Sequence, residues 1–147
     1  MMSSRNKLIA KTVLYWIISL TWGGIMTFIG LFAMLVLLLL GYRPKRHGHG
    51  IYFELGHRWG GISFGPVFIV NEGATTNIKN HEYGHGFQNL CWGILFPIVI
   101  AIPSLTRYFY RIYRQKKHPK KQLPPYDNIW FEGQASKWGE KHMMTKL

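Results

Sequence analysis

The sequence predicts an α+β protein in which an N-terminal transmembrane helix precedes a small domain. Three observations favour this class. Residues 12–40 contain no charged side chain, residues 51–55 and 62–70 are rich in β-branched and aromatic residues between glycines, and residues 76–92 follow the pattern of a capped helix. We therefore expect, in chain order, an anchor, a small antiparallel hairpin or meander, a helix, a kinked apolar helix and a C-terminal helix.

The uncharged segment over residues 12–40 is long enough to cross a bilayer. As a helix it measures about 43 Å, whereas the hydrocarbon core is ~30 Å thick, so a tilted transmembrane helix is the natural interpretation. A cleaved signal peptide is the alternative, because basic residues precede the segment. However, the segment is about twice as long as a signal core, and no small-residue cleavage site follows it. We expect an anchor over residues 1–42 and a second domain over residues 43–147.

The chain is strongly basic, with a formal net charge of +12. Such an excess suits nucleic acid, anionic lipid or the cytoplasmic side of a membrane protein. Because no zinc-finger cysteine pattern and no basic helix beside a heptad repeat occurs, we expect no nucleic acid partner. Residues 107–121 interleave arginines with tyrosines at helical spacing, as an interfacial helix does, although a solvated basic helix would show the same pattern. We expect anionic headgroups of a lipid bilayer to contact residues 107–121.

One motif carries chemistry: residues 81–85 read His-Glu-Tyr-Gly-His. His81 and His85 lie on the same face of a helix, so both imidazoles can bind one Zn²⁺ ion. Glu82 is rotated about 100° from His81 and can accept a proton from a metal-bound water, which is why His-Glu-x-x-His is the zincin signature. The plain alternative is a helix with two surface histidines. Gly84 and Gly86 each cost a helix up to about 1 kcal/mol, so we expect another element to pack closely there.

A catalytic zinc ion needs a third protein ligand. The extended metzincin motif is excluded, because Gln88 and Cys91 stand where it needs Gly and His. The Asp-Gly motif of membrane-embedded proteases is also missing, because the only Asp, Asp127, is followed by Asn. Glu132 is the best remaining candidate. It belongs to a helix expected over residues 128–141, whose small residues can lie against Gly84 and Gly86.

Several alternatives to these assignments stay open. Glu132 also suits an exposed position near a helix N-terminus. The side chains that compete with it as third ligand are His47, His49, His57 and Glu140. A hydrolase also needs a group that stabilises the oxyanion, and the candidates for this role are Tyr126, His118 and His142.

With these pieces in place, the chain resembles the gluzincin-like metallopeptidases, in which a Glu on a second helix completes the metal site. More closely, it resembles small bacterial membrane-associated domains with a shared order of motifs. These are an Arg-Trp-Gly-Gly segment, His-Glu-Tyr-Gly-His, Ile-Pro-Ser and a Glu-x-x-Ala helix, found here at residues 58–61, 81–85, 102–104 and 132–135. The resemblance covers residues 51–140 and implies Glu132 as third ligand. Glu132 follows Phe131 and precedes Gly133, where a Thr-Glu-Lys type of sequence would be expected.

Taken together, we expect a membrane-anchored zinc-dependent hydrolase of the bacterial inner membrane, a metallopeptidase that acts on peptides or proteins. The first alternative is a catalytically silent membrane protein or interaction module with a structural or vestigial metal site. The second alternative is a toxin-like protein that acts through residues 107–121.

A metal site shared by His85 and Glu132 constrains the membrane topology. If residues 90–105 spanned the bilayer, His85 and Glu132 would lie on opposite sides of it. We therefore expect that membrane-associated segment to be kinked, re-entrant or buried at the surface, with Pro97 and Pro103 bending it.

Overall fold

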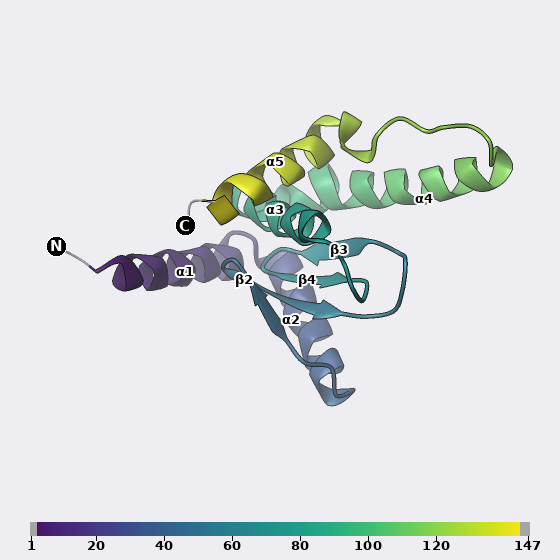
Figure 1. Cartoon of the computed structure of the whole chain (residues 1–147). Coiled ribbons are helices and arrows are strands. Elements are labelled where there is room, and N and C mark those ends of the chain that lie inside the picture. The colour runs from purple at the N-terminus through teal and green to yellow at the C-terminus, as the bar shows by residue number, and fades with distance from the viewer. Residues whose placement is uncertain (1–2, 145–147) are drawn as a thin grey trace.

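The computed structural model describes residues 3–144 and confirms the α+β class (Figure 1). Within this range the helices are α1 (Ser4–Thr21), α2 (Gly24–Leu39), α3 (Thr76–Trp92), α4 (Ile102–Lys117) and α5 (Trp130–Met144). The strands are β1 (Lys45–His47), β2 (Gly50–Glu54), β3 (Gly61–Phe64) and β4 (Val67–Val70). Three short helical turns complete the chain: η1 (Gly93–Leu95), η2 (Pro97–Ala101) and η3 (Tyr126–Asn128).

The sheet is mixed, whereas the sequence predicted an antiparallel hairpin or meander. Its strand order is β1-β2-β4-β3. The β1–β2 and β3–β4 pairs are antiparallel, and β2 pairs with β4 in parallel. The predicted strand over residues 62–70 is a hairpin, because Gly65 adopts a positive φ of 74° between β3 and β4. The connection over residues 55–60 carries the chain past β4, so that β3 becomes the outer strand.

Both faces of the sheet are covered, which explains why β4 is apolar at every position. Alternate residues point to opposite faces. Phe53, Val67 and Ile69 form a buried cluster with Leu37 of α2, whereas Tyr52, Phe68 and Val70 form another with Tyr15 of α1 and Tyr83 of α3. The N-terminal apolar segment therefore supplies core residues on both sides of the sheet.

The single helix predicted over residues 12–40 is instead two helices, α1 and α2. The direction of the chain bends by 104° between them. The break lies at Gly23, where a Cβ would overlap the side chain of Asn89 from α3. Asn89 Nδ2 donates a hydrogen bond to the carbonyl of Gly23 (3.3 Å), and Thr27 Oγ1 donates to that carbonyl (3.0 Å) and to the carbonyl of Ser19 (2.7 Å). These buried polar contacts hold the bend.

No individual helix within residues 3–144 has both the length and the apolar composition that a bilayer crossing requires. Two bent pairs meet the requirement when their halves are counted together: α1 with α2, and α3–η1 with η2–α4.

The kink predicted for residues 90–105 is confirmed, because the second of these pairs is bent by 120°. Gly93 takes a positive φ of 53° at the end of α3, and Pro97 begins η2, where its missing N–H interrupts the helical ladder. Pro103 plays a different part from the one predicted. It lies in the first turn of α4, where proline is tolerated.

The bend returns the chain so that α5 lies along α3 (Figure 1). The two helices approach so closely that a Cβ on Gly84 would overlap the backbone of Ala135, and one on Gly139 would overlap the backbone of Asn80. The close packing predicted at Gly84 is thus confirmed. Gly86 instead faces Tyr15 and the carbonyl of Gly65. The last helix starts at Trp130, two residues later than predicted.

This packing yields a prediction for Gly84→Ala. The added methyl group overlaps backbone atoms, so α3 and α5 must separate, and we expect a loss of about 1–3 kcal/mol in the free energy of unfolding. Thermal and denaturant unfolding in detergent, followed by near-ultraviolet circular dichroism, measures the loss. Gly24→Ala is the matched control, because its Cβ would meet only ordinary contacts at 3.5 Å. Equal stability of the two variants would contradict the packing described.

Candidate metal centre

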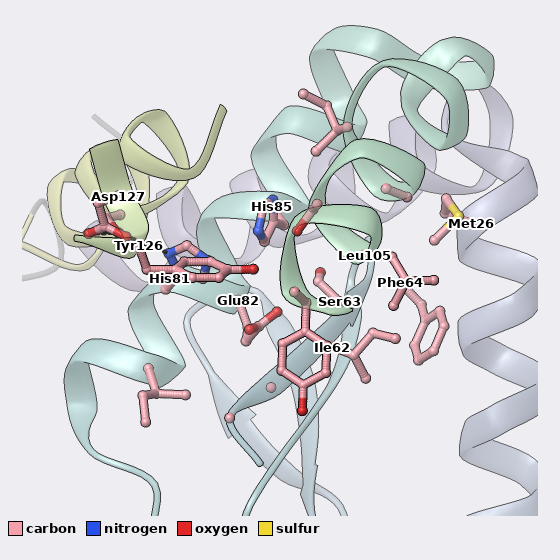
Figure 2. Close-up of a pocket in the computed structure, with 18 of the residues that line it drawn as sticks. Met26, Ile62, Ser63, Phe64, His81, Glu82, His85, Leu105, Tyr126 and Asp127 are labelled. Atoms are coloured by element: carbon pink, nitrogen blue, oxygen red, sulfur yellow. Dashed lines mark hydrogen bonds and ion pairs between the residues drawn. The ribbon is translucent and has the colours of Figure 1, made fainter. Parts of the chain in front are cut away.

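The His-Glu-Tyr-Gly-His residues belong to helix α3, and a side-chain cap fixes the residue at which this helix begins. The N–H of Ile78 donates to Thr75 Oγ1 at 3.4 Å, so the cap lies one residue before the predicted position at Thr76 or Asn77. The helix ends at Trp92, as predicted. His81, Glu82 and His85 of this helix all face one cavity (Figure 2).

His81, His85 and Glu132 lie together, as predicted, and form a group that could hold a metal ion. Glu132 Oε2 is 3.1 Å from His81 Nε2 and 3.3 Å from His85 Nε2. All three donor atoms lie within 4.8 Å of one another. Tetrahedral zinc with bonds of about 2.0–2.1 Å places its ligand atoms about 3.3 Å apart. The two distances to Glu132 therefore match the ligand spacing of a zinc site, while the distance between the two imidazole nitrogens is bounded by 4.8 Å.

The surroundings of the Glu132 carboxylate suit a cation. Its side chain is fully buried, Oε2 lies beside the Nε2 atoms of both imidazoles, and neither oxygen makes a well-aligned hydrogen bond within the described residues. A buried charge is costly unless it is paired or bound to metal. Burial by itself would raise the pKa of Glu132, but the imidazoles of His81 and His85 hold that pKa below its ordinary value.

A second layer of contacts orients both imidazoles. Ser136 Oγ donates to Asp127 Oδ2 (2.8 Å) and lies 2.9 Å from His81 Nδ1, so it accepts the Nδ1 proton of His81. His85 Nδ1 lies 2.7 Å from Gln88 Oε1 and donates to it. With each proton on Nδ1, the lone pair of each Nε2 is directed at the shared position, as metal-binding histidines require.

Sequence reasoning missed the residues of this second layer. Gln88 entered the sequence argument only as a departure from the metzincin pattern, yet its Nε2 also donates to the carbonyl of Phe131 (2.7 Å), beside Glu132. The spacing of three residues from His85 would have placed Gln88 on the same helix face. Helix periodicity places Ser136 on the face of Glu132, but nothing in the sequence indicated its contact with His81, and nothing placed Asp127 there.

Glu82 lies on the wall of a cavity of about 690 Å³ that also exposes His81 and His85. Burial raises the pKa of Glu82 to about 7, with the charge of His85 lowering it and that of Glu132 raising it. Strand β3 runs along the same cavity, and a Cβ on Gly61 would come within 2.6 Å of Glu82 Oε1. A larger residue at position 61 would displace the carboxylate.

Of the three candidates for oxyanion stabilisation, Tyr126 alone lines the cavity. Its ring centroid is 6.0 Å from that of His81, and Figure 2 shows its hydroxyl directed away from His81, between His85 and Glu82 in the view. Burial raises the pKa of Tyr126 to about 12, and the charge of Glu132 adds to the rise, so the phenol stays protonated at neutral pH. His118 is exposed, and His142 stacks on Phe87 with centroids 3.8 Å apart.

The four side chains that compete with Glu132 as third ligand all lie outside the metal group. The ring of His47 contacts Asn80 Oδ1 (2.8 Å), and that of His49 contacts Thr12 Oγ1 (2.8 Å). His57 is largely exposed beside Glu72. Glu140 lines the cavity but is exposed and stands outside the ligand group.

No family model matches the chain, and neither a curated protein nor a solved structure shows significant similarity to it. The gluzincin-like resemblance therefore remains an expectation.

The ligand assignment predicts the metal content of two variants. Purified in detergent and dialysed against zinc, the native protein should retain about one Zn²⁺ per chain. Glu132→Ala should retain almost none, because two imidazoles remain without the carboxylate. Elemental analysis by mass spectrometry measures the ratio. Glu72→Ala is the control, since that carboxylate is exposed and distant from the group. Equal zinc in Glu132→Ala and the native protein would exclude Glu132 as an essential ligand.

Proposed function

We propose that this protein is a membrane-bound zinc-dependent hydrolase, specifically a metallopeptidase. One observation carries the proposal: two imidazole nitrogens and a buried carboxylate converge within 4.8 Å, and Glu82 lies beside them on the wall of a cavity large enough for a peptide segment. Two His and one Glu form a known catalytic ligand set that leaves a position open.

His81, His85 and Glu132 hold the ion, and the second layer keeps their donor atoms in place. Zinc bound there supplies a Lewis acid that acidifies a water molecule and polarises a carbonyl group. Glu82 takes the proton from the attacking water and passes it to the amine that leaves when the peptide bond breaks. Tyr126 donates its hydroxyl proton in a hydrogen bond to the carbonyl oxygen as negative charge develops there.

A peptide substrate is supported by strand β3, the outer strand on its side of the sheet. The N–H of Asn71 donates to the carbonyl of Gly60 (2.9 Å). Because bonded and non-bonded pairs alternate in an antiparallel ladder, the backbone groups of Gly61 and Ser63 point away from β4. Both residues line the cavity. An extended peptide that pairs with this edge would lie along the metal group.

Membrane binding is supported by the surface of the helices. Residues of α4 are exposed or half-buried along its whole length, and Ile102, Leu105 and Phe109 form an exposed apolar stripe on it. Arg107 and Arg111 donate to backbone carbonyls of the following loop. Within residues 107–121, we therefore assign contact with anionic headgroups mainly to the more distal basic residues, Arg114, Lys116, Lys117, Lys120 and Lys121. The positive-inside rule favours the cytoplasmic face of a bacterial inner membrane.

Glu82→Gln separates the peptidase from a catalytically silent protein with a metal site. The amide keeps the size of the side chain but accepts no proton, so zinc content should be unchanged while kcat falls about 10²–10⁴-fold. The assay incubates the zinc-loaded protein in detergent with a mixed peptide pool and identifies products by mass spectrometry. Full zinc occupancy without cleavage by the native protein would support the silent alternative, whereas full activity in Glu82→Gln would exclude Glu82 as the general base.

The same assay tests Tyr126→Phe. Loss of one hydrogen bond to the developing oxyanion should lower kcat about 10²-fold with little change in KM. A change in KM alone would instead assign Tyr126 to substrate binding. Tyr113→Phe, on the exposed part of α4, is the control for removing a tyrosine hydroxyl.

A further inference from the structure

The exposed large apolar side chains are confined to a few segments of the chain, and we call the surface that they form the apolar surface. Among the described residues they occur on α1, the α1–α2 break, α2 and Leu40, on η1, η2 and α4, and at Trp130 of α5. None occurs over residues 41–93, although that stretch contains the whole sheet and all of α3. Leu39 and Phe32 of α2 are among the most exposed, and α2 buries its opposite side against the sheet. A helix that is apolar on both sides needs a cover on its outer side.

The position of the basic residues indicates that lipid covers the apolar surface. Each apolar stretch is flanked by an exposed basic cluster: Arg5, Lys7 and Lys11 near the start of α1, Arg43, Lys45 and Arg46 after α2, and Lys116, Lys117, Lys120 and Lys121 at the end of α4. Basic residues beside an apolar segment attract anionic headgroups. Exposed Trp22 and Trp130 have the amphipathic rings that prefer the membrane interface. A second copy of this chain would bring these positive clusters together.

The cavity is continuous with the apolar surface. Ile102 and Leu105 line the cavity, yet they are 59% and 47% exposed and belong to the apolar surface. Met26, Phe96 and Ile100 line the cavity beside them.

The lining of the cavity also includes polar residues, among them Asn77, Asp127, Ser136 and Glu140. Figure 2 shows Met26 and Asp127 on opposite sides of the view, with His81, Glu82 and His85 between them. The metal group thus lies between an apolar side of the cavity and a side at which the Asp127 carboxylate is exposed.

We infer that the substrate is a polypeptide tethered to the same bilayer by a transmembrane helix or lipid anchor, and that it is cut just outside the membrane. This inference rests on the proposed peptidase function. The substrate polypeptide enters the cavity over Ile102 and Leu105, with its membrane-proximal residues at the apolar side. It then passes the metal group along β3 and leaves past Asp127 and Glu140. Water attacks the peptide carbonyl, the C–N bond breaks, and the new amine takes up the proton.

The test compares two forms of one peptide pool. The zinc-loaded protein is reconstituted into vesicles of phosphatidylethanolamine and phosphatidylglycerol, and a mixed-sequence pool is added with either a palmitoyl or an acetyl group at its N-terminus. We expect the palmitoylated pool to be cut at least tenfold faster, because tethering raises the effective concentration. Its cuts should cluster within about ten residues of the lipid, since an extended chain advances about 3.3 Å per residue. The acetylated pool should show no such clustering.

Two variants show whether the substrate enters at the apolar side of the cavity or whether any attachment of the protein to lipid is sufficient. Leu105→Asn places an amide at the mouth of the cavity, so we expect it to reduce the ratio of the two rates and scatter the cut positions. Ile98→Asn removes a similarly exposed apolar side chain that does not line the cavity, and should keep the clustering. Zinc content and vesicle flotation show whether each variant is folded and bound.

The possible outcomes distinguish failure of the tethered-substrate inference from failure of the proposed peptidase function. Equal rates and scattered cuts in both pools overturn the tethered-substrate inference and leave the peptidase intact. A stable dimer that does not float with vesicles also overturns it, because protein then covers the apolar surface. Cleavage of neither pool by the zinc-loaded native protein removes the peptidase function and the inference with it.

Discussion

The close approach of α3 and α5 is the constraint on which the site depends. Gly84 and Gly139 each lie where a Cβ would overlap backbone of the opposite helix, so the two helices pack at a distance that only glycine permits. At that distance the carboxylate of Glu132 reaches both imidazoles of α3. Separation by the width of a methyl group would leave the carboxylate buried but remote from its partners, which is the most costly arrangement for a charge.

The fold positions the candidate ligand group, and a bound ion would in turn stabilise the fold. Helix packing brings Glu132 beside His81 and His85, and a divalent ion there would compensate for two buried oxygens without well-aligned hydrogen bonds among the described residues. Ser136, on the same helix as Glu132, supports His81 from its other side. Since α5 supplies both a ligand and a second-layer contact, metal binding should tie the C-terminal helix to the core and contribute to the stability of the fold.

The local features of the site could be predicted from the sequence because they depend on helix periodicity. His81 and His85 share a face at a spacing of four, and Glu132 followed by small residues indicated a helix that can approach α3. Features that depend on distant contacts could not be predicted. The bend at Gly23 requires Asn89, 66 residues away, and hydropathy alone indicated one continuous helix. The parallel pairing of β2 with β4 depends on the path of the loop over residues 55–60, and the support of His81 by Asp127 and Ser136 exists only once α5 has docked.

Zinc K-edge X-ray absorption of the zinc-loaded protein in detergent shows whether two imidazoles and one carboxylate bind a single zinc ion. We expect a shell of about four nitrogen and oxygen atoms at 2.0–2.1 Å, with the outer-shell scattering of two imidazole rings. A sulfur neighbour at about 2.3 Å, as binding by Cys91 would give, or a shell without imidazole scattering would contradict this expectation.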